Sequence, residues 1–208
     1  MIELFSADTP NGKKIGIMLE EIKFEYKVTK VNLLEGEQFN PEFRKISPFS
    51  KIPVILDHRN NNEAILESGA ILIYLDEKSK KFYDIDDRLK INQWLMAQMG
   101  YVGPIIGQHH QFHHYNPGKS KFGEERYFKI TKSIYKDLDE RLEKNEFLAK
   151  DYSIADIATF PWIARHDWHD IGLKNFKNLT RWYKTISNRE AVIKGYDLLK
   201  RDEKIPPP

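Results

Sequence analysis

The chain has 208 residues, of which 40% are hydrophobic and 31% charged, with a formal net charge of +2 and no cysteine. This composition is typical of a globular protein with one large or two small domains. The balanced charge argues against a nucleic-acid or membrane partner, and no apolar run approaches the roughly 20 residues that span a bilayer.

The lack of cysteine limits the chemistry further. It excludes structural disulfides, thiolate metal sites and a cysteine nucleophile. Any thiol chemistry therefore needs a sulfur atom that arrives on a ligand. The first ten residues lack the basic and apolar regions of a signal peptide, so we expect a cytoplasmic location.

Strand and helix patterns alternate along the first part of the chain. A strand is predicted over residues 2–6, and Thr9 and Pro10 then form a favourable N-cap and first turn for a helix that runs to Ile22. A second strand over residues 26–32 and a short helix over residues 41–45 follow.

Residues 47–78 contain the pattern around which the chain is organised. A β-branched run after Pro53, an asparagine-rich loop and a second short strand predict a hairpin, and a helix follows it. Glu67 and Ser68 lie at the start of that helix, where unpaired backbone N–H groups bind a carboxylate. Pro53 favours an edge position or a special turn, such as a turn that contains a cis peptide bond.

The order strand, helix, strand, short helix, strand, strand, helix predicts a thioredoxin-like layout, because the first crossover is right-handed and the hairpin adds the last strand. After it the alternation stops and helical spacing takes over. We therefore predict an α/β plus all-α fold: a thioredoxin-like βαβ-ββα domain at 1–78, a linker at 79–87 and an all-helical domain at 88–208.

The predicted helical domain has clear internal signals. A helix over residues 89–99 is expected to bend or stop at residues 100–104, and a long helix follows over residues 124–142. Ser153 and Asp156 read as a structural capping box. The last helices are expected at residues 181–187 and 191–199, and the three terminal prolines are expected to fray.

The chain contains the motifs FSADTPNGKK (5–14), GEQFNPEF (36–43), ISPFSKIP (46–53), ESGAILIYL (67–75), GPIIGQHHQF (103–112) and YSIADIA (152–158). These motifs resemble those of the glutathione transferase superfamily, and within it the nu class of bacterial disulfide-bond oxidoreductases related to a yeast nitrogen regulator. The resemblance covers nearly the whole chain and implies a glutathione-dependent enzyme without a catalytic tyrosine, serine or cysteine.

The resemblance also implies roles for individual residues. Thr9 and Asn11 correspond to the groups that act on the glutathione thiol, although Thr9 also reads as a plain helix cap. Ser6 is an alternative candidate, as a conventional hydroxyl group that activates the thiol. The glutathione-binding residues implied by the family motif are Asn11, Gln38, Lys51, Ile52, Glu67, Ser68, Gln93 and Arg126.

Four histidines form two i, i+4 pairs, His109 with His113 and His110 with His114. Such spacing can place two imidazoles together on a helix, as metal sites do. No recognised carboxylate or cysteine ligand pattern accompanies them, so we expect no metal, and the resemblance implies that they line a substrate cleft or the surface.

Three functions are compatible with these patterns. The first is reduction of small organic disulfides by the thiolate of bound glutathione, with glutathione or its disulfide as co-substrate. The second is conventional conjugation of glutathione to electrophiles, and the third is a non-enzymatic regulatory module with a glutathione-binding fold. A homodimer, the norm of the superfamily, is the expected assembly.

Overall fold

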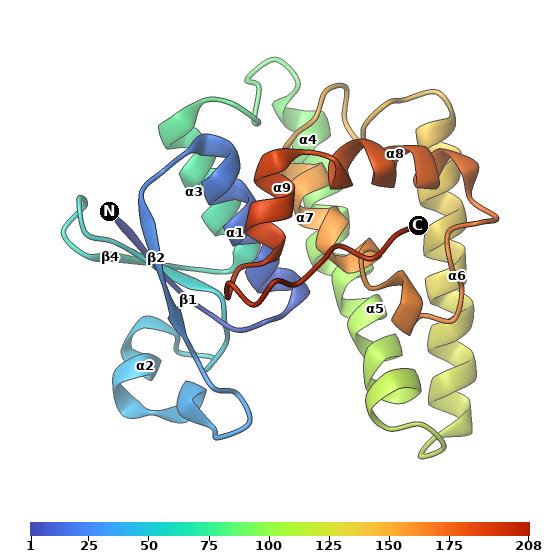
Figure 1. Ribbon diagram of the computed structural model, residues 1–208, viewed down its shortest axis with the longest axis horizontal. Coiled ribbons are helices and arrows are strands. Elements are labelled where there is room, and N and C mark those ends of the chain that lie inside the picture. Colours follow the sequence, from blue (N-terminus) through green and yellow to red (C-terminus); the bar gives the residue numbers. More distant parts are fainter. The chain divides into compact units, whose positions relative to one another are not determined.

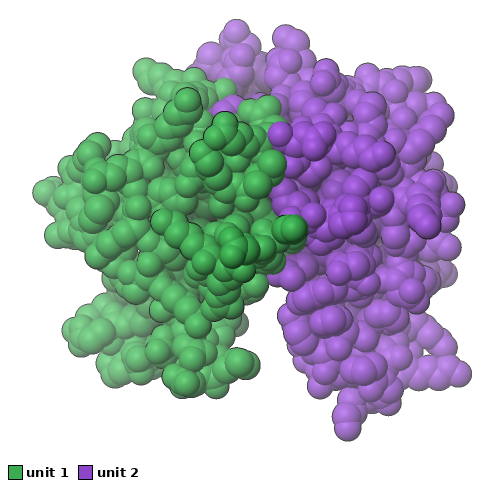
Figure 2. Space-filling view, viewed as in Figure 1, with its two compact units in different colours: residues 1–81, 189–204 green, residues 82–188, 205–208 purple.

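The computed structural model describes all 208 residues, which divide into two compact units (Figure 1, Figure 2). The first unit comprises residues 1–81 and 189–204, and the second comprises residues 82–188 and 205–208. None of the helices combines the length and the apolar character that a membrane crossing requires.

A four-stranded sheet with the strand order β2-β1-β3-β4 organises the first unit. β1 (Ile2–Ser6) pairs in parallel with β2 (Tyr26–Lys30), and α1 (Pro10–Ile22) connects them. β3 (Val54–Asp57) pairs antiparallel with β1 and with β4 (Glu63–Leu66). The predicted βαβ-ββα order is therefore confirmed.

Helices cover both faces of this sheet (Figure 1). Successive strand residues point to opposite faces, so Leu4 and Phe5 of β1 belong to different layers. Leu4 is fully buried on the face where α1 packs against α3 (Ser68–Ser79). Phe5 lies on the face of α2 (Pro41–Ile46), with its ring centroid 6.2 Å from that of Phe43.

The C-terminal helix α9 (Glu190–Tyr196) belongs to the first unit, which the order of the chain does not predict. It packs on α1, where Gly16 meets Gly195. A Cβ on Gly195 would lie 2.4 Å from Ile17 Cα, and one on Gly16 would lie 2.6 Å from Gly195 O. Only glycine at both positions allows the two backbones to approach this closely.

The second unit is all-helical, as predicted. Its elements are α4 (Arg88–Ala97), the π-helical η2 (Gln98–Val102), α5 (Gly103–His109), the π-helical η3 (His110–Tyr115), α6 (Lys121–Glu143), α7 (Ile154–Ile163), the 3₁₀ turn η4 (His166–Trp168) and α8 (Lys177–Ser187). The predicted interruption after residue 99 takes the form of η2, in which the chain widens to a π turn but stays helical.

The predicted capping box at the start of α7 is confirmed. Asp156 Oδ2 accepts hydrogen bonds from Ser153 N and Oγ, both at 3.1 Å. Its Oδ1 accepts from Leu148 N at 2.9 Å and from Trp182 Nε1 at 2.8 Å. Because every residue of α7 is buried, these bonds fix the central helix of the unit.

The expectation of a frayed C-terminus is wrong. Residues 205–208 group with the second unit, and Tyr183 Oη donates to Pro206 O at 2.7 Å. Tyr183 is itself fully buried, so its hydroxyl requires a partner, and the terminal carbonyl supplies it.

Candidate functional site

The turn between β1 and α1 carries the predicted thiol-activating residues. Thr9 has extended backbone angles (φ −139°, ψ 155°), and its Oγ1 accepts from Gly12 N at 3.1 Å. Its role as the N-cap of α1 is confirmed. A hydroxyl has one donor and two acceptor positions, so capping leaves the hydroxyl proton of Thr9 available for a ligand.

Gly12 determines how tightly this turn closes. A Cβ at Gly12 would lie 2.2 Å from Ser6 Oγ and 2.6 Å from Ala7 O. Ser6 is fully buried and donates its hydroxyl to Ala7 O at 3.2 Å. The Ser6 hydroxyl therefore faces inward, which favours Thr9 and Asn11 over Ser6 as donors to a ligand.

Asn11 is half-buried in the first turn of α1. No acidic residue lies in that turn, so no carboxylate within it offsets the partial positive charge of the helix N-terminus. The preceding carboxylate, Asp8, is directed to Lys13, whose Nζ lies 3.1 Å from Asp8 Oδ1. The start of α1 is thus suited to an anion such as a thiolate.

The segment before β3 has the backbone geometry that the sequence suggested. The Ile52–Pro53 peptide bond is cis. Ile52 precedes Val54, the first paired residue of β3, so its backbone groups lie outside the sheet ladder. The loop is held by Ser47 Oγ, which donates to Lys51 O at 2.7 Å and accepts from Lys51 N at 2.9 Å, while Lys51 itself is exposed.

Glu67 and Ser68 form the second part of the candidate site. Glu67 is exposed and has φ 67° and ψ 114°, a backbone conformation that non-glycine residues rarely adopt. Ser68 is the first residue of α3 and is 4% exposed. Its Oγ lies 3.3 Å from Lys14 Nζ, a buried lysine to which the sequence analysis assigned no role.

Gln38 lies in the 3₁₀ turn η1 (Glu37–Phe39). Its Nε2 donates weakly to Leu33 O at 3.4 Å, and its buried Oε1 has no hydrogen-bond partner within the chain. A buried acceptor without a partner is unfavourable, so a donor group on a ligand would relieve this cost.

Gln93 and Arg126 belong to the second unit. Gln93 lies on α4 and Arg126 in the first two turns of α6, and both residues are exposed. Their contact with a ligand bound by the first unit stays a prediction.

The expectation that all four histidines line a cleft or the surface is wrong for His109 and His110, which are 0% and 5% exposed. His110 Nε2 lies 2.7 Å from Nε2 of His169, and Tyr135 Oη lies 2.6 Å from Nδ1 of His169. His109 Nε2 donates to His169 O at 3.0 Å. No i, i+4 pattern points to His169, so the sequence analysis missed it.

This cluster is a buried hydrogen-bonded network inside the second unit. Burial, followed by the nearby histidine and arginine charges, lowers the pKa of His110 to about 3. Burial likewise holds the pKa of His169 well below its usual value. Both rings are neutral at physiological pH, so one donates and the other accepts in the His110–His169 bond.

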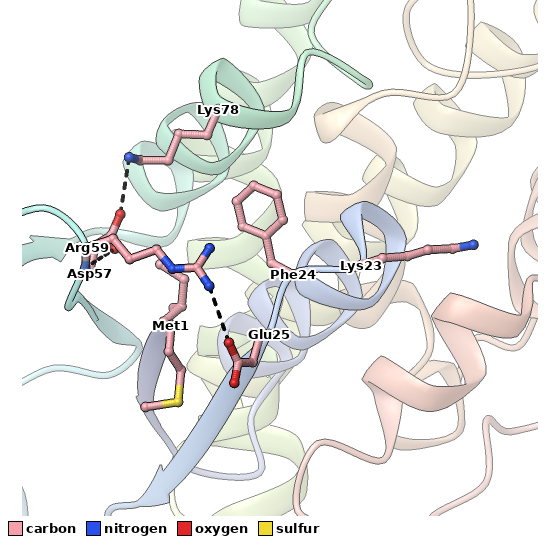
Figure 3. Close-up of a pocket in the computed structure, with 8 residues that line it drawn as sticks. Met1, Lys23, Phe24, Glu25, Asp57, Arg59 and Lys78 are labelled. Atoms are coloured by element: carbon pink, nitrogen blue, oxygen red, sulfur yellow. Dashed lines mark hydrogen bonds and ion pairs between the residues drawn. The ribbon is translucent and has the colours of Figure 1, made fainter.

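A recess of about 490 Å³ lies at the start of β1, the opposite end of that strand from Ser6. Figure 3 shows the residues that line it. Four of its charged side chains form two pairs: Lys78 Nζ lies 3.2 Å from Asp57 Oδ2, and Arg59 Nη2 lies 3.3 Å from Glu25 Oε2. None of the predicted site residues lines this recess. Because these four charged groups are already paired, we place the functional site at the other end of the strand.

The match to known families agrees with this geometry. The model of the glutathione S-transferase N-terminal domain matches residues 2–77, and that of the C-terminal domain matches residues 105–190. The chain belongs to the glutathione S-transferase family.

Individual members of this family are similar to the chain along nearly its whole length. The disulfide-bond oxidoreductase YfcG of Escherichia coli K12 is 42% identical over 207 residues, covering 96% of this chain and 95% of that protein. The transcriptional regulator URE2 of Saccharomyces cerevisiae is 31% identical over 235 residues, covering 92% of this chain and 66% of that protein.

A solved structure is also similar. A Pseudomonas putida glutathione transferase, crystallised with one glutathione disulfide bound per subunit, has a TM-score of 0.88 and 38% identity, covering 95% of this chain and 91% of that chain. The predicted resemblance and two-part fold are confirmed, and so is the prediction that the protein is an enzyme.

Proposed function

We propose that this protein is a glutathione-dependent disulfide-bond oxidoreductase that uses the thiolate of bound glutathione in place of a protein cysteine. The observation that carries the proposal is the turn at Thr9–Gly12, which offers a hydroxyl, an amide and a helix N-terminus in a chain without cysteine. The likeness to YfcG and to a structure with bound glutathione disulfide supports it.

The turn can supply the energy that thiol activation requires. A free thiol with a pKa of about 8.5 is only slightly ionised at pH 7. Half ionisation at pH 7 needs a shift of about 1.5 pH units, or about 2 kcal/mol. A hydrogen bond to a charged acceptor contributes about 1.5–3 kcal/mol, and a helix terminus adds about 0.3–1 kcal/mol. We assign these contributions to Thr9, Asn11 and the start of α1.

The proposed reaction consists of two exchanges. The glutathione thiolate attacks one sulfur of a small disulfide, forms a mixed disulfide and releases the first thiolate, which takes up a proton. A second glutathione attacks the mixed disulfide, so that two glutathiones and one disulfide give two thiols and glutathione disulfide. The protein contributes position and electrostatic stabilisation of the sulfur anion.

The ends of glutathione define the remaining roles in this proposal. The exposed Glu67 carboxylate takes the γ-glutamyl ammonium, while Ser68 and the start of α3 take the adjacent carboxylate. Ile52 pairs with the cysteinyl backbone, Lys51 meets the glycine carboxylate, and the buried Oε1 of Gln38 accepts a ligand N–H. In this proposal Gln93 and Arg126 contact the ligand from the helical domain. The proposal also keeps the predicted domain limits: a thioredoxin-like domain at 1–78, a linker at 79–87 and a helical domain at 88–208.

Conjugation of glutathione to electrophiles is the second candidate, because both family models that match are those of glutathione S-transferases. The same activated thiolate would attack carbon instead of sulfur. The likeness to URE2 keeps a regulatory, non-enzymatic module as a third possibility.

The deciding experiment compares two glutathione-dependent activities of purified protein. We expect reduction of a small dialkyl disulfide to exceed conjugation of an activated aryl halide. Conjugation that dominates by more than about tenfold would overturn the first choice in favour of the second. Glutathione binding without either activity would favour the regulatory module.

We also propose that the protein is a homodimer. α4 exposes Leu89 (76%) and Met96 (52%) one heptad apart on one face, and Ile85 just before it is 71% exposed. Exposed apolar side chains that share a face mark interaction surfaces. Light scattering at micromolar concentration should give about twice the 24.6 kDa chain mass, and a Leu89→Lys, Met96→Lys variant should give the chain mass.

A further inference from the structure

Lys13 is a fully buried lysine near the start of α1, the helix that carries the candidate thiol site. Its Nζ lies 3.1 Å from Asp8 Oδ1, in the turn before the helix. The same Nζ donates to Tyr196 O at 2.7 Å and to Glu203 Oε2, and it lies 3.9 Å from the centroid of the Tyr196 ring. A buried ammonium group needs such partners, so Lys13 joins the turn before α1 to the segment after α9.

We propose that Lys13 is a positioning residue of the thiol site, which holds the Asp8 carboxylate against the C-terminal segment and balances its charge, so that the thiol of glutathione ionises more readily at the start of α1. This inference rests on the proposed function, because it deepens the role of the same site. It adds a residue that acts on the thiol through Asp8, and it gives residues 197–204 a part in that role.

The position of Asp8 explains why its charge matters. Asp8 is the one acidic residue between the end of β1 and the first turn of α1, and it directly precedes the Thr9 cap. Adjacent Cα atoms are about 3.8 Å apart, so a thiol bonded to Thr9 lies on the order of 10 Å from the Asp8 carboxylate. A negative charge at that range opposes a thiolate and offsets the favourable effect of the helix N-terminus. The ammonium of Lys13 counters this charge at 3.1 Å.

The segment after α9 keeps that ammonium in place. The carboxylate of Asp197 accepts from Arg201 N at 2.7 Å and from Asp202 N at 3.1 Å, and these bonds fold the chain just after the helix. Glu203 follows directly and pairs with Lys13, while Tyr196 supplies its carbonyl from the last residue of α9. Three oxygen partners and one ring therefore fix the position of the Lys13 ammonium beside Asp8.

The other charged groups on the helices around Lys13 are directed elsewhere. α1 packs against α9 and α3, and no charged residue of either helix forms an ion pair with Lys13. On α1, Lys14 extends to Ser68 at the start of α3, and Glu21 pairs with Arg189. Asp8 and Glu203 are therefore the two charges that Lys13 balances.

The test measures the thiol pKa of glutathione bound to purified protein by thiolate absorbance against pH, with the S-methylglutathione complex as the blank. Lys13→Met should raise this thiol pKa by about 0.5–1 unit, because it leaves the Asp8 charge unbalanced. Asp8→Asn keeps the size of the side chain and an acceptor oxygen, and it should lower the thiol pKa by a similar amount. The double variant should return to within about 0.3 unit of the wild-type value.

The pH profile of disulfide reduction separates an electrostatic role from a structural one. A thiol pKa raised by about 0.5–1 unit lowers the thiolate fraction about three- to tenfold below that pKa. The rate of Lys13→Met should therefore fall by this factor at pH 6 and approach the wild-type rate at pH 10, where the thiol is ionised in both proteins. Lys194→Met, which removes a lysine of α9 that pairs with Glu190, should change neither the rate nor the thiol pKa.

The outcomes distinguish this inference from the function on which it rests. A thiol pKa that is unchanged in Lys13→Met, or raised but not restored in the double variant, would overturn the role of Lys13 and leave the proposed function standing. If Lys13→Met does not fold, Asp8→Asn decides, because an unchanged or raised thiol pKa in that variant would overturn the role as well. Wild-type protein that binds no glutathione, or binds it with the thiol pKa of free glutathione, would overturn the proposed function itself.

Discussion

Replacing Gly12 with alanine tests the structure of the thiol site through a single methyl group. Alanine is the better helix former by about 1 kcal/mol, so helix propensity alone predicts a more stable protein. The added Cβ would lie 2.6 Å from Ala7 O and 2.2 Å from Ser6 Oγ, where ordinary contacts begin at 3.4 Å. Ser6 is fully buried, and Ala7 O belongs to the backbone, so neither oxygen moves away easily.

The expected size of the effect follows from these opposing contributions. Overpacking a tight site costs about 1–3 kcal/mol and sometimes more, and a backbone contact this short belongs at the upper end. After the gain in helix propensity, we expect Gly12→Ala to lose about 1–2 kcal/mol of unfolding free energy. The turn must shift to relieve the contact, so glutathione-dependent disulfide reduction should fall as well.

Urea denaturation followed by circular dichroism, with activity measured on the same samples, checks this expectation. Gly100→Ala is the matched control, because Gly100 is exposed in a helical segment and its Cβ would meet no atom within 4 Å. The control should be unchanged or up to about 1 kcal/mol more stable. If Gly12→Ala equals Gly100→Ala in stability and activity, the close approach of α1 to β1 is refuted.

The remaining predictions concern the ligand and the buried histidines. Asn11→Ala should lower the disulfide reductase rate about tenfold or more, which corresponds to at least about 1.4 kcal/mol of activation free energy. It should also raise the thiol pKa of bound glutathione, measured by thiolate absorbance. Wild-type values for both the rate and the thiol pKa would make Asn11 a structural residue. Glu67→Ala and Ser68→Ala should each weaken glutathione binding by about 1.5–3 kcal/mol in calorimetry with an unchanged circular dichroism spectrum, and unchanged affinity in both would remove them from the site. His110 and His169 have folded pKa values below the unfolded value of about 6.5, so the stability they contribute is present above that pH and is lost as the pH falls toward about 3. Urea midpoints of wild-type protein should therefore fall from pH 7 to pH 5 more steeply than those of His110→Phe, and equal slopes would contradict the neutral pair.

The order of elements in the first unit could be predicted because its turns have strong local chemistry. Thr9 and Pro10 mark the start of α1 through a cap and a fixed φ angle, and the structure begins that helix at Pro10. The asparagine-rich loop before Glu63 marks the hairpin in the same way. These signals act between residues that are close in the sequence, so they can be identified from a single sequence without knowledge of the fold.

The parts that could not be predicted depend on distant partners or on rare geometry. His169 joins His110 across 59 residues, and no periodic pattern connects them. The π turns η2 and η3 have no sequence period of their own, so the histidine spacing was interpreted for an α-helix. Lys14 shows the same limit, because a lysine in a helix is ordinarily solvated and only the fold places it beneath Ser68.

The glycine contact between α1 and α9 also has a consequence for synthesis on the ribosome. Gly16 is made early, whereas Gly195 is made only after residues 82–188 of the second unit. Until then, one face of α1 has no helix against it, and Lys13 lacks Tyr196 and Glu203. The first unit is therefore completed only after residues 82–188 of the second unit have been translated, and a nascent chain that ends before residue 190 leaves that face open to chaperones and proteases.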